Sequence, residues 1–255
     1  MHLAKNVRRA AAVFLVFAAA AAATAQEQKA APHWTYTGEA SAKHWGDLDP
    51  AFAECKMGHH QSPINISKTE KARLDPIEFH YQESPLKVTD NGHTIQVSYA
   101  AGSFITVGGH RYNLMQFHFH HPSEEKIHGK GWPMAAHLVH ADDSGKLAVV
   151  AVLLEPGMAN ATIQSVWDNL PKEKDAARAV DNVRVDAGNL LPQDHGYYTF
   201  AGSLTTPPCS EDVTWFVLKT PATISAAELA AFTRLYPLDA RPVQPLYGRV
   251  VKETE

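Results

Sequence analysis

The sequence predicts one mainly β domain of the α+β class, built around a largely antiparallel sheet. Segments with strand patterning outnumber helical ones, and the gaps between strands are mostly too short for helical crossovers. The 16 prolines and 15 glycines are spread along the 255 residues, which favours many turns over long helices. Neither a repeat nor a low-complexity linker follows residue 33, so we expect a single domain.

Composition and charge narrow the function classes. Hydrophobic residues make up 45% and charged residues 20% of the chain, as in ordinary globular proteins. The formal net charge is −4, whereas proteins that bind nucleic acid normally carry a basic surplus. We therefore expect no nucleic-acid partner.

The first 25 residues have the pattern of a secretory signal peptide. Three cations and no acid precede an apolar run of 14 residues, and Ala23-Thr24-Ala25 supplies a small-x-small cleavage site. The alternative is a membrane anchor, but a spanning helix needs about 20 apolar residues. Cleavage removes three of the 23 cations and none of the 27 acids, so the mature formal net charge is −7. We expect residues 26–255 to form a periplasmic or secreted domain without a membrane span.

Export changes the expected state of the two cysteines, Cys55 and Cys209. An even number of cysteines in an oxidising compartment indicates one disulfide. The chain-entropy model gives about 4–5 kcal/mol for closing a loop this long. The alternative is a pair of buried free thiols.

Along the mature chain, residues 33–62 show no clear period and predict irregular structure. Five later segments have strand patterning between turn signals: 94–99, 111–121, 135–140, 147–154 and 213–218. One helix is expected from about residue 160 to residue 170, before Pro171. A second helix is expected to begin at a capping box, formed by Ser225 and Glu228, and to end near Tyr236.

The candidates for chemistry are histidines, seven of the 15 lying between positions 110 and 140. Side chains alternate along a strand, so His118 and His120 share one face. If the segment 135–140 pairs with their strand, His137 completes a cluster of three. The same parity adds neighbours to this face: Gln116, Ala135 and Val139.

Three imidazoles on one face suit catalytic zinc, which takes three protein ligands and leaves a fourth position for water. Other histidines of this stretch are expected, from parity or loop position, to be supporting, core or surface residues: His121, His128 and His140. The chain has no His-Glu-x-x-His segment, so nothing supports a helical metalloprotease.

Several motifs, in order and over about residues 33–250, resemble the α-class carbonic anhydrases. They are Gln-Ser-Pro-Ile-Asn-Ile (61–66), Asn-Gly-His (91–93), Gln-Phe-His-Phe-His (116–120), Pro-Ser-Glu (122–124), His-Leu-Val-His (137–140), Gly-Ser-Leu-Thr-Thr-Pro-Pro-Cys (202–209) and Arg-Pro-Val-Gln-Pro-Leu (241–246), with Trp34, Tyr36 and Trp45 near the start. The positions of Cys55 and Cys209 resemble those of bacterial, exported members, which join them. The resemblance implies a strongly twisted central sheet of about ten strands with short peripheral helices.

The resemblance also implies an activity, the reversible hydration of carbon dioxide to bicarbonate and a proton. Zinc would be held by three ligands: His118, His120 and His137. A zinc-bound hydroxide would attack carbon dioxide. Thr205 would accept a hydrogen bond from this hydroxide and donate its own proton to Glu124, and His93 would carry the released proton to buffer.

Further positions match the family's substrate site. Apolar residues that would otherwise be interpreted as core match the wall that holds carbon dioxide: Val139, Val149, Leu204, Val213 and Trp215. Thr206 matches a residue that helps to hold bicarbonate and inhibitors, and Gln116 matches a partner of His118. The inhibitors implied are sulfonamides and small anions, and a homodimer is a candidate assembly.

Two positions depart from the family's pattern. Many members place a glutamate two positions before the third ligand, where this chain has Ala135, and Glu125 stands where a histidine is common. The outer nitrogen of His137 must then find another partner or water. Such partners tune metal affinity or activity about 10–100-fold, so zinc retention is the property in question.

Two other function classes compete with this interpretation. One is an exported zinc-binding or catalytically weak module, although such modules usually lose a zinc histidine, and all three are present here. The other is a different zinc hydrolase such as an esterase, for which the narrow apolar wall would be a poor fit.

Overall fold

The computed structural model describes residues 33–255, so the expected signal peptide and residues 26–32 lie outside the described part. Helices within it are short: α1 (Trp45–Leu48), α2 (Glu54–Met57), α3 (Ala161–Trp167) and α4 (Ala226–Leu235). Three 3-10 turns accompany them: η1 (Gly38–Ala40), η2 (Pro50–Phe52) and η3 (Ala187–Leu190). Within residues 33–255, no helix has the length and apolar character needed to cross a membrane.

Strands make up most of the fold. They are β1 (Asn65–Ile66), β2 (Glu70–Ala72), β3 (Glu78–His80), β4 (Ser84–Asp90), β5 (Ile95–Ser98), β6 (Phe104–Val107), β7 (His110–His120), β8 (Lys126–Ile127), β9 (Met134–Ala141), β10 (Leu147–Pro156), β11 (Ala176–Val185), β12 (Tyr197–Gly202), β13 (Val213–Leu218), β14 (Ala222–Ile224) and β15 (Lys252–Thr254).

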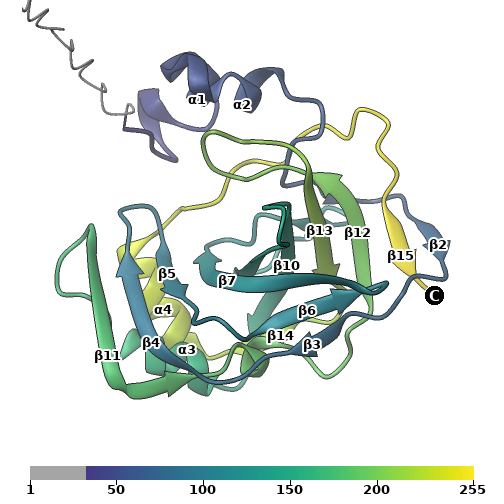
Figure 1. The fold of residues 1–255 in the computed structure, drawn as a ribbon. Coiled ribbons are helices and arrows are strands. Elements are labelled where there is room, and N and C mark those ends of the chain that lie inside the picture. Colours follow the sequence, from purple (N-terminus) through teal and green to yellow (C-terminus); the bar gives the residue numbers. More distant parts are fainter. Residues whose placement is uncertain (1–32) are drawn as a thin grey trace, which may run out of the picture. The chain divides into compact units, whose positions relative to one another are not determined.

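Thirteen of these strands form one twisted sheet (Figure 1). Ten follow one another in the order β11-β4-β5-β7-β9-β10-β13-β12-β15-β2, while β3, β6 and β14 pair beside this row. The predicted antiparallel character holds for most pairs, but β10 runs parallel to both β13 and β14, and β15 parallel to β2. The sheet is therefore mixed, and the row from β11 through β4, β5, β7 and β9 to β10 is antiparallel throughout.

The two helices expected from the sequence are present. Ser225 caps α4 through the predicted reciprocal bonds with Glu228. Helix α3 starts after Asn160, whose side chain accepts from the N–H groups of Thr162 and Ile163, but it ends at Trp167 rather than near residue 170. The segment 33–62, expected to be irregular, also contains the single-turn helices α1 and α2, whose four-residue length is too short to give a period.

The alternation of side chains on the central strands gives the sheet two buried faces. One face packs with α3 and α4 in a cluster that includes Phe117, Phe119 and Phe232. The opposite face carries a smaller cluster, which includes Ala135, Val149 and Trp215. The histidines predicted to bind metal lie on this second face, because they alternate with Phe117 and Phe119 along β7.

Candidate active site

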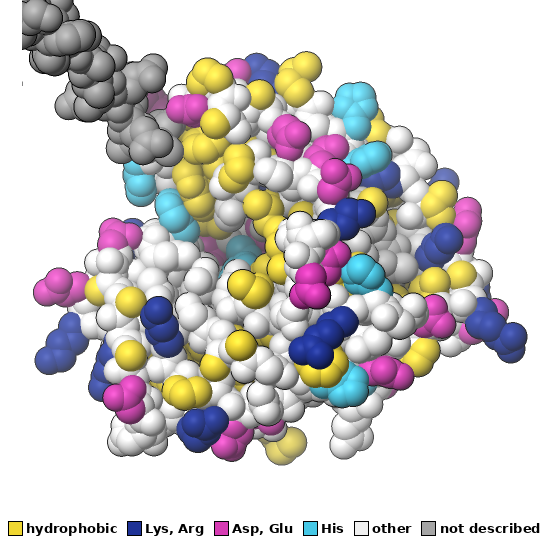
Figure 2. Space-filling view, in the orientation of Figure 1, with side chains coloured by type: hydrophobic (Ala, Val, Ile, Leu, Met, Phe, Trp, Pro, Cys, Tyr) yellow, Lys and Arg dark blue, Asp and Glu magenta, His cyan; other side chains and the backbone are white. Residues whose placement is uncertain are grey.

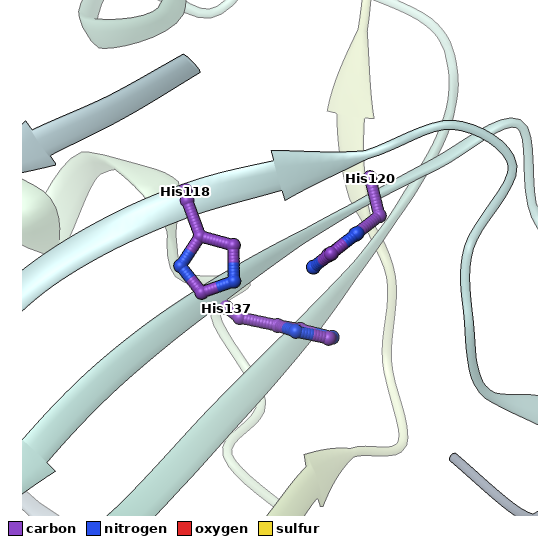
Figure 3. A group of neighbouring side chains, drawn as sticks. All are labelled: His118, His120 and His137. Atoms are coloured by element: carbon purple, nitrogen blue, oxygen red, sulfur yellow. The ribbon is translucent and has the colours of Figure 1, made fainter. Parts of the chain in front are cut away.

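Pairing of β7 with β9 brings the three predicted zinc ligands together. His118 lies directly opposite His137, and His120 lies opposite Ala135. The ring centroids are 5.0 Å apart for His118 and His120, 5.5 Å for His118 and His137, and 4.6 Å for His120 and His137. In Figure 3 the three imidazoles project from neighbouring strands toward one shared space. Their ligand atoms all lie within 4.8 Å of one another.

Hydrogen bonds decide which nitrogen of each ring faces that space. Nδ1 of His118 lies 2.9 Å from Oε1 of Gln116, and Nδ1 of His120 lies 2.7 Å from the carbonyl oxygen of Asp239. Both partners are acceptors, so each Nδ1 carries the proton and each Nε2 keeps a lone pair. Burial lowers the pKa of His118 to about 3 and that of His120 well below its usual value, with the nearby His137 adding to both shifts. Both rings are therefore neutral, as metal ligation requires.

His137 is held in the opposite sense, through Nε2. The carboxylate oxygens of Glu125 lie 3.0 and 3.2 Å from this nitrogen, which leaves Nδ1 for a metal. Burial alone would lower the pKa of His137, but the Glu125 carboxylate raises it. The expectation that the outer nitrogen of His137 finds another partner, in the absence of a glutamate at position 135, is confirmed: a carboxylate is supplied from position 125.

The donor set fits zinc. In each ring one nitrogen makes the hydrogen bond described above, and the other three nitrogens converge. Of these three, Nε2 of His120 is buried without any hydrogen-bond partner among the described residues. Buried polar atoms are normally paired, so an orphaned lone pair aimed at two others indicates a missing cation. Three nitrogen ligands with an open fourth position are the donor set of catalytic zinc.

Glu124 lies beside this centre and is buried. Its Oε1 accepts a hydrogen bond of 2.7 Å from the backbone N–H of Arg241, and its Oε2 lies 3.6 Å from Nε2 of His120. Burial, together with the Glu125 charge, raises the pKa of Glu124 to about 7, while the Arg241 N–H and the Thr205 hydroxyl act in the lowering direction. Thr205 therefore lies close enough to Glu124 to influence its pKa, and its role as a donor to Glu124 stays a prediction.

The segment 239–241 supports both Glu124 and His120, although no residue pattern indicates this role. The Asp239 carbonyl accepts from His120, and the Asp239 carboxylate accepts from the backbone N–H of His121. A backbone acceptor carries no residue signature, and Asp239 follows a Pro-Leu pair that predicts only a turn. Its only available signal was its place just before the family-like motif at 241–246.

A cavity of about 160 Å³ opens above the histidines. Gln116, Thr205 and Thr206 line it, as do four of the five predicted wall residues: Val139, Val149, Leu204 and Trp215. The fifth, Val213, is buried behind this wall in the same cluster. Figure 2 shows the hollow, with histidines inside it and hydrophobic side chains along one side. Thr94 and Gln96, which were not predicted, also line the cavity because they alternate on β5 and its approach.

His93 lines the same cavity and is stacked on Trp34. The ring centroids of His93 and Trp34 are 3.6 Å apart with an interplanar angle of 7°, and His33 stacks on the His93 ring at 5.5 Å. The turn before His93 is fixed because Asn91 Oδ1 accepts from the N–H groups of His93 and Thr94. Burial lowers the pKa of His93, and the charges of His33 and Lys174 act in the same direction.

Three further histidines of the stretch 110–140 lie outside the cluster. His140 is buried, hydrogen-bonded to the Tyr81 hydroxyl at 2.8 Å, and burial lowers its pKa to about 4. His121 makes a contact of 2.7 Å from Nδ1 to the Pro133 carbonyl. His128 adopts a positive φ of 50° in a turn. These positions agree with the supporting or structural roles that parity suggested.

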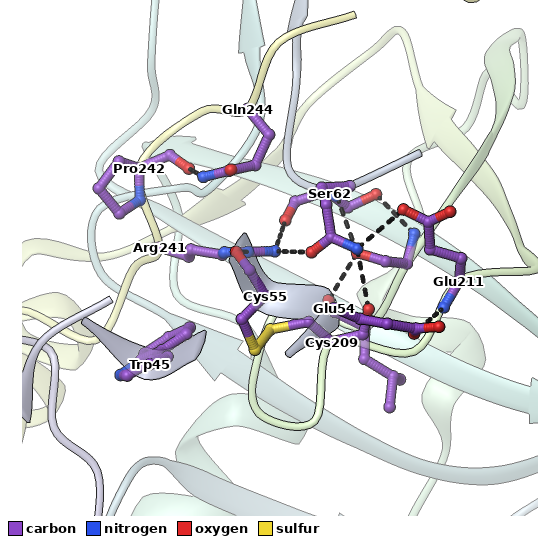
Figure 4. The surroundings of a disulfide bond; sticks show 12 residues. Trp45, Glu54, Cys55, Ser62, Cys209, Glu211, Arg241, Pro242 and Gln244 are labelled. Atoms are coloured by element: carbon purple, nitrogen blue, oxygen red, sulfur yellow. Dashed lines mark hydrogen bonds between the residues drawn. A yellow bond between two sulfur atoms is a disulfide. The ribbon is translucent and has the colours of Figure 1, made fainter. Parts of the chain in front are cut away.

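Cys55 and Cys209 form the predicted disulfide, which joins α2 to the loop that carries Thr205. Arg241 lies beside the bridge and contacts both Cys55 and Ser62 (Figure 4). Its guanidinium donates to the carbonyls of Cys55 and Ser62 at 3.0 and 2.7 Å, and to Gln61 Oε1 at 2.9 Å. The disulfide and the catalytic loop are thereby tied to the residue whose backbone holds Glu124.

A family model described as eukaryotic-type carbonic anhydrase matches residues 40–255. The chain belongs to the eukaryotic-type carbonic anhydrase family. It is 47% identical over 223 residues to the carbonic anhydrase of Neisseria gonorrhoeae, covering 87% of this chain and 88% of that protein. It is 46% identical over 226 residues to the carbonic anhydrase of Klebsiella pneumoniae, covering 88% and 92%.

A solved member shares the fold as well as the sequence. The α-carbonic anhydrase of Thermovibrio ammonificans, in complex with sulfanilamide, superposes with a TM-score of 0.83 at 42% identity, covering 86% of this chain and 98% of that one. As a carbonic anhydrase, this chain is a zinc-dependent lyase that reversibly hydrates carbon dioxide.

Proposed function

We propose that His118, His120 and His137 hold one zinc ion, and that the surrounding residues of this chain orient the reactants and move the proton. The observation that carries this assignment is the convergence of three imidazole nitrogens, one from each ring. Each ring makes its hydrogen bond through its other nitrogen. Bound at this centre, zinc supplies a water molecule of lowered pKa and hence a hydroxide nucleophile near neutral pH.

Thr205 and Glu124 orient the nucleophile. Glu124 is fixed by the Arg241 N–H, and in its ionised form it accepts from the Thr205 hydroxyl, whose oxygen then accepts on its inner side. The inner side of the Thr205 oxygen would then accept the O–H of a hydroxide supplied by zinc, so that Thr205 would orient this nucleophile toward the substrate. Correct orientation of this kind lowers the barrier by removing unproductive geometries.

Carbon dioxide binds against the apolar wall of the cavity. Val139, Val149 and Leu204 offer no hydrogen bonds, which suits a small apolar substrate. Thr206 at the same cavity is placed to hydrogen-bond the more polar product, bicarbonate. The small volume, about 160 Å³, disfavours bulky esters.

His93 acts as the proton shuttle between the cavity and solvent. It lines the cavity, it is half-buried, and its lowered pKa keeps its ring neutral and able to accept a proton near pH 7. Trp34 supports the ring from one side.

The protein works outside the cytoplasm, in the periplasm or as a secreted enzyme. This proposal is supported by the signal-peptide pattern of residues 1–25 and by the Cys55–Cys209 disulfide, which persists in oxidising compartments. Aromatic sulfonamides are proposed to bind the same cavity, since the solved relative was obtained with sulfanilamide. A homodimer stays a prediction, to be tested by light scattering on the mature protein.

The assigned activity is tested by stopped-flow hydration of carbon dioxide on mature protein before and after zinc chelation. We expect chelation to abolish hydration and added zinc to restore it. Hydration that persists in zinc-free protein would contradict the assignment.

A further inference from the structure

The third ligand, His137, owes its orientation to a residue that no motif assigned. We propose that Glu125 is the positioning residue for His137, and that the buried space beside Nε2 accepts one carboxylate only, so that Glu125 and Ala135 form a matched pair. This inference rests on the zinc centre proposed above.

The contact between Glu125 and His137 is sealed from solvent. Both Glu125 oxygens lie within 3.2 Å of Nε2, and the two side chains are 0% and 1% exposed. Among residues 33–255, His137 is the only hydrogen-bond partner of the Glu125 carboxylate. A buried carboxylate with one partner is costly unless that partner is positively polarised. An imidazole that carries a cation on its other nitrogen is such a partner.

Hydrogen bonds fix the backbone of Glu125. Ser123 Oγ donates to the Glu125 carbonyl at 3.0 Å and itself accepts from the Trp132 N–H at 2.9 Å. The Ser123 N–H donates to the Trp132 carbonyl at 2.9 Å. This clamp holds the carboxylate on the Nε2 side of His137, so that Nδ1 is presented to the metal without a search through ring orientations.

Ala135 leaves the space that Glu125 fills. It lies two residues before His137 on the same face of β9 and is fully buried between His120 of β7 and Leu153 of β10. Ligand atoms of Glu124, Glu125 and His137 already lie within 4.8 Å of one another. A longer acidic side chain at position 135 would add a third carboxylate to this sealed space, where like charges repel strongly. While Glu125 is present, we therefore expect that Ala135→Glu does not tighten zinc binding.

A double-mutant cycle tests the pairing. The variants are Glu125→Ala, Glu125→Gln, Ala135→Glu and the double variant Glu125→Ala with Ala135→Glu. The readout is the rate of zinc loss from loaded protein to a fixed chelator, with the visible spectrum of cobalt-substituted protein reporting ligand geometry. Glu78→Gln, which changes an exposed glutamate on β3, is the matched control and should keep the parental rate.

We expect Glu125→Ala to lose zinc about 10–100-fold faster than the parent and Glu125→Gln to show a smaller acceleration. Ala135→Glu alone should lose zinc no more slowly than the parent and melt at a lower temperature. The double variant should return to within about threefold of the parental rate, because the carboxylate is then supplied from β9.

The proposal would be overturned if Glu125→Ala lost zinc at the parental rate. It would also be overturned if the fold-change in the zinc-loss rate of the double variant equalled the product of the two single-variant fold-changes. If Glu125→Ala does not fold, Glu125→Gln keeps the side-chain shape, and a parental rate in that variant overturns it equally. A parental protein that binds no zinc at all would instead contradict the zinc centre, so the two failures are distinguishable.

Discussion

The backbone N–H of Arg241 donates a hydrogen bond of 2.7 Å to Oε1 of Glu124. The guanidinium of the same Arg241 holds the carbonyl of Cys55, next to the disulfide that anchors the catalytic loop. One residue therefore links the Glu124 carboxylate to the bridge next to the loop that carries Thr205. The catalytic role proposed for Glu124 and the structural role of the disulfide are consequently expected to be coupled.

Replacing Thr205 by Val removes both the acceptor for the nucleophile and the donor to Glu124. We expect kcat/KM for hydration to fall about 100-fold or more, with zinc content unchanged. Thr206→Val, at the neighbouring position of the same cavity, should give a smaller loss. Equal losses from the two variants would show that Thr205 has no special orienting role.

Reducing the disulfide, or replacing both cysteines by Ser, should lower the free energy of unfolding by about 4–5 kcal/mol and the melting temperature by about 10–20 °C. Because Arg241 connects the bridge to Glu124, kcat should also fall while zinc stays bound. Calorimetry, zinc analysis and hydration assays on the same samples check this. Free thiols titrated in native exported protein would contradict the bridge itself.

Replacing His93 by Ala should slow turnover by up to about 100-fold in weak or bulky buffer. Imidazole buffer should restore much of the loss, since it can carry the proton itself. The exchange of carbon dioxide with bicarbonate, measured at chemical equilibrium, should change little. A parallel fall in exchange and turnover would mean that His93 is structural.

The pH profile tests the environment of His93. Burial first, and then the charges of His33 and Lys174, lower its pKa, while Asp175 opposes them. Only the neutral ring accepts a proton, so proton-limited turnover should rise with pH through a midpoint below the usual histidine pKa of about 6.5. Trp34→Ala exposes the ring and should move that midpoint upward, slowing turnover near pH 6 but not at high pH. An unmoved midpoint would assign the titration to another group.

The sequence was sufficient to predict the central strands and the cluster of three histidines. His118, His120 and His137 follow from period-2 alternation and one assumed pairing, which the register of β7 and β9 confirms. Strand β11 was not predicted, because Ala176–Val185 mixes charged and apolar residues at an exposed sheet edge and shows no clean period.

The supporting contacts were harder to predict. The partners of His120 and Glu124 are a backbone carbonyl and a backbone N–H, from Asp239 and Arg241, and such groups carry no residue signature. The sequence shows a glutamate at position 125, but it does not show which way the Glu125 side chain points. It follows β7 in a turn, where strand parity no longer fixes which way a side chain points.

The zinc content and carbon dioxide hydration of His120→Ala, measured beside the parental protein, test the metal centre most directly. Among residues 33–255, Nε2 of His120 is buried without a hydrogen-bond partner, and replacing His120 leaves two imidazoles that cannot hold an open tetrahedral site. We expect one zinc per chain in the parent, and in the variant little bound zinc and hydration at the uncatalysed rate. Parental zinc content and parental hydration in His120→Ala would contradict the assignment of the three histidines.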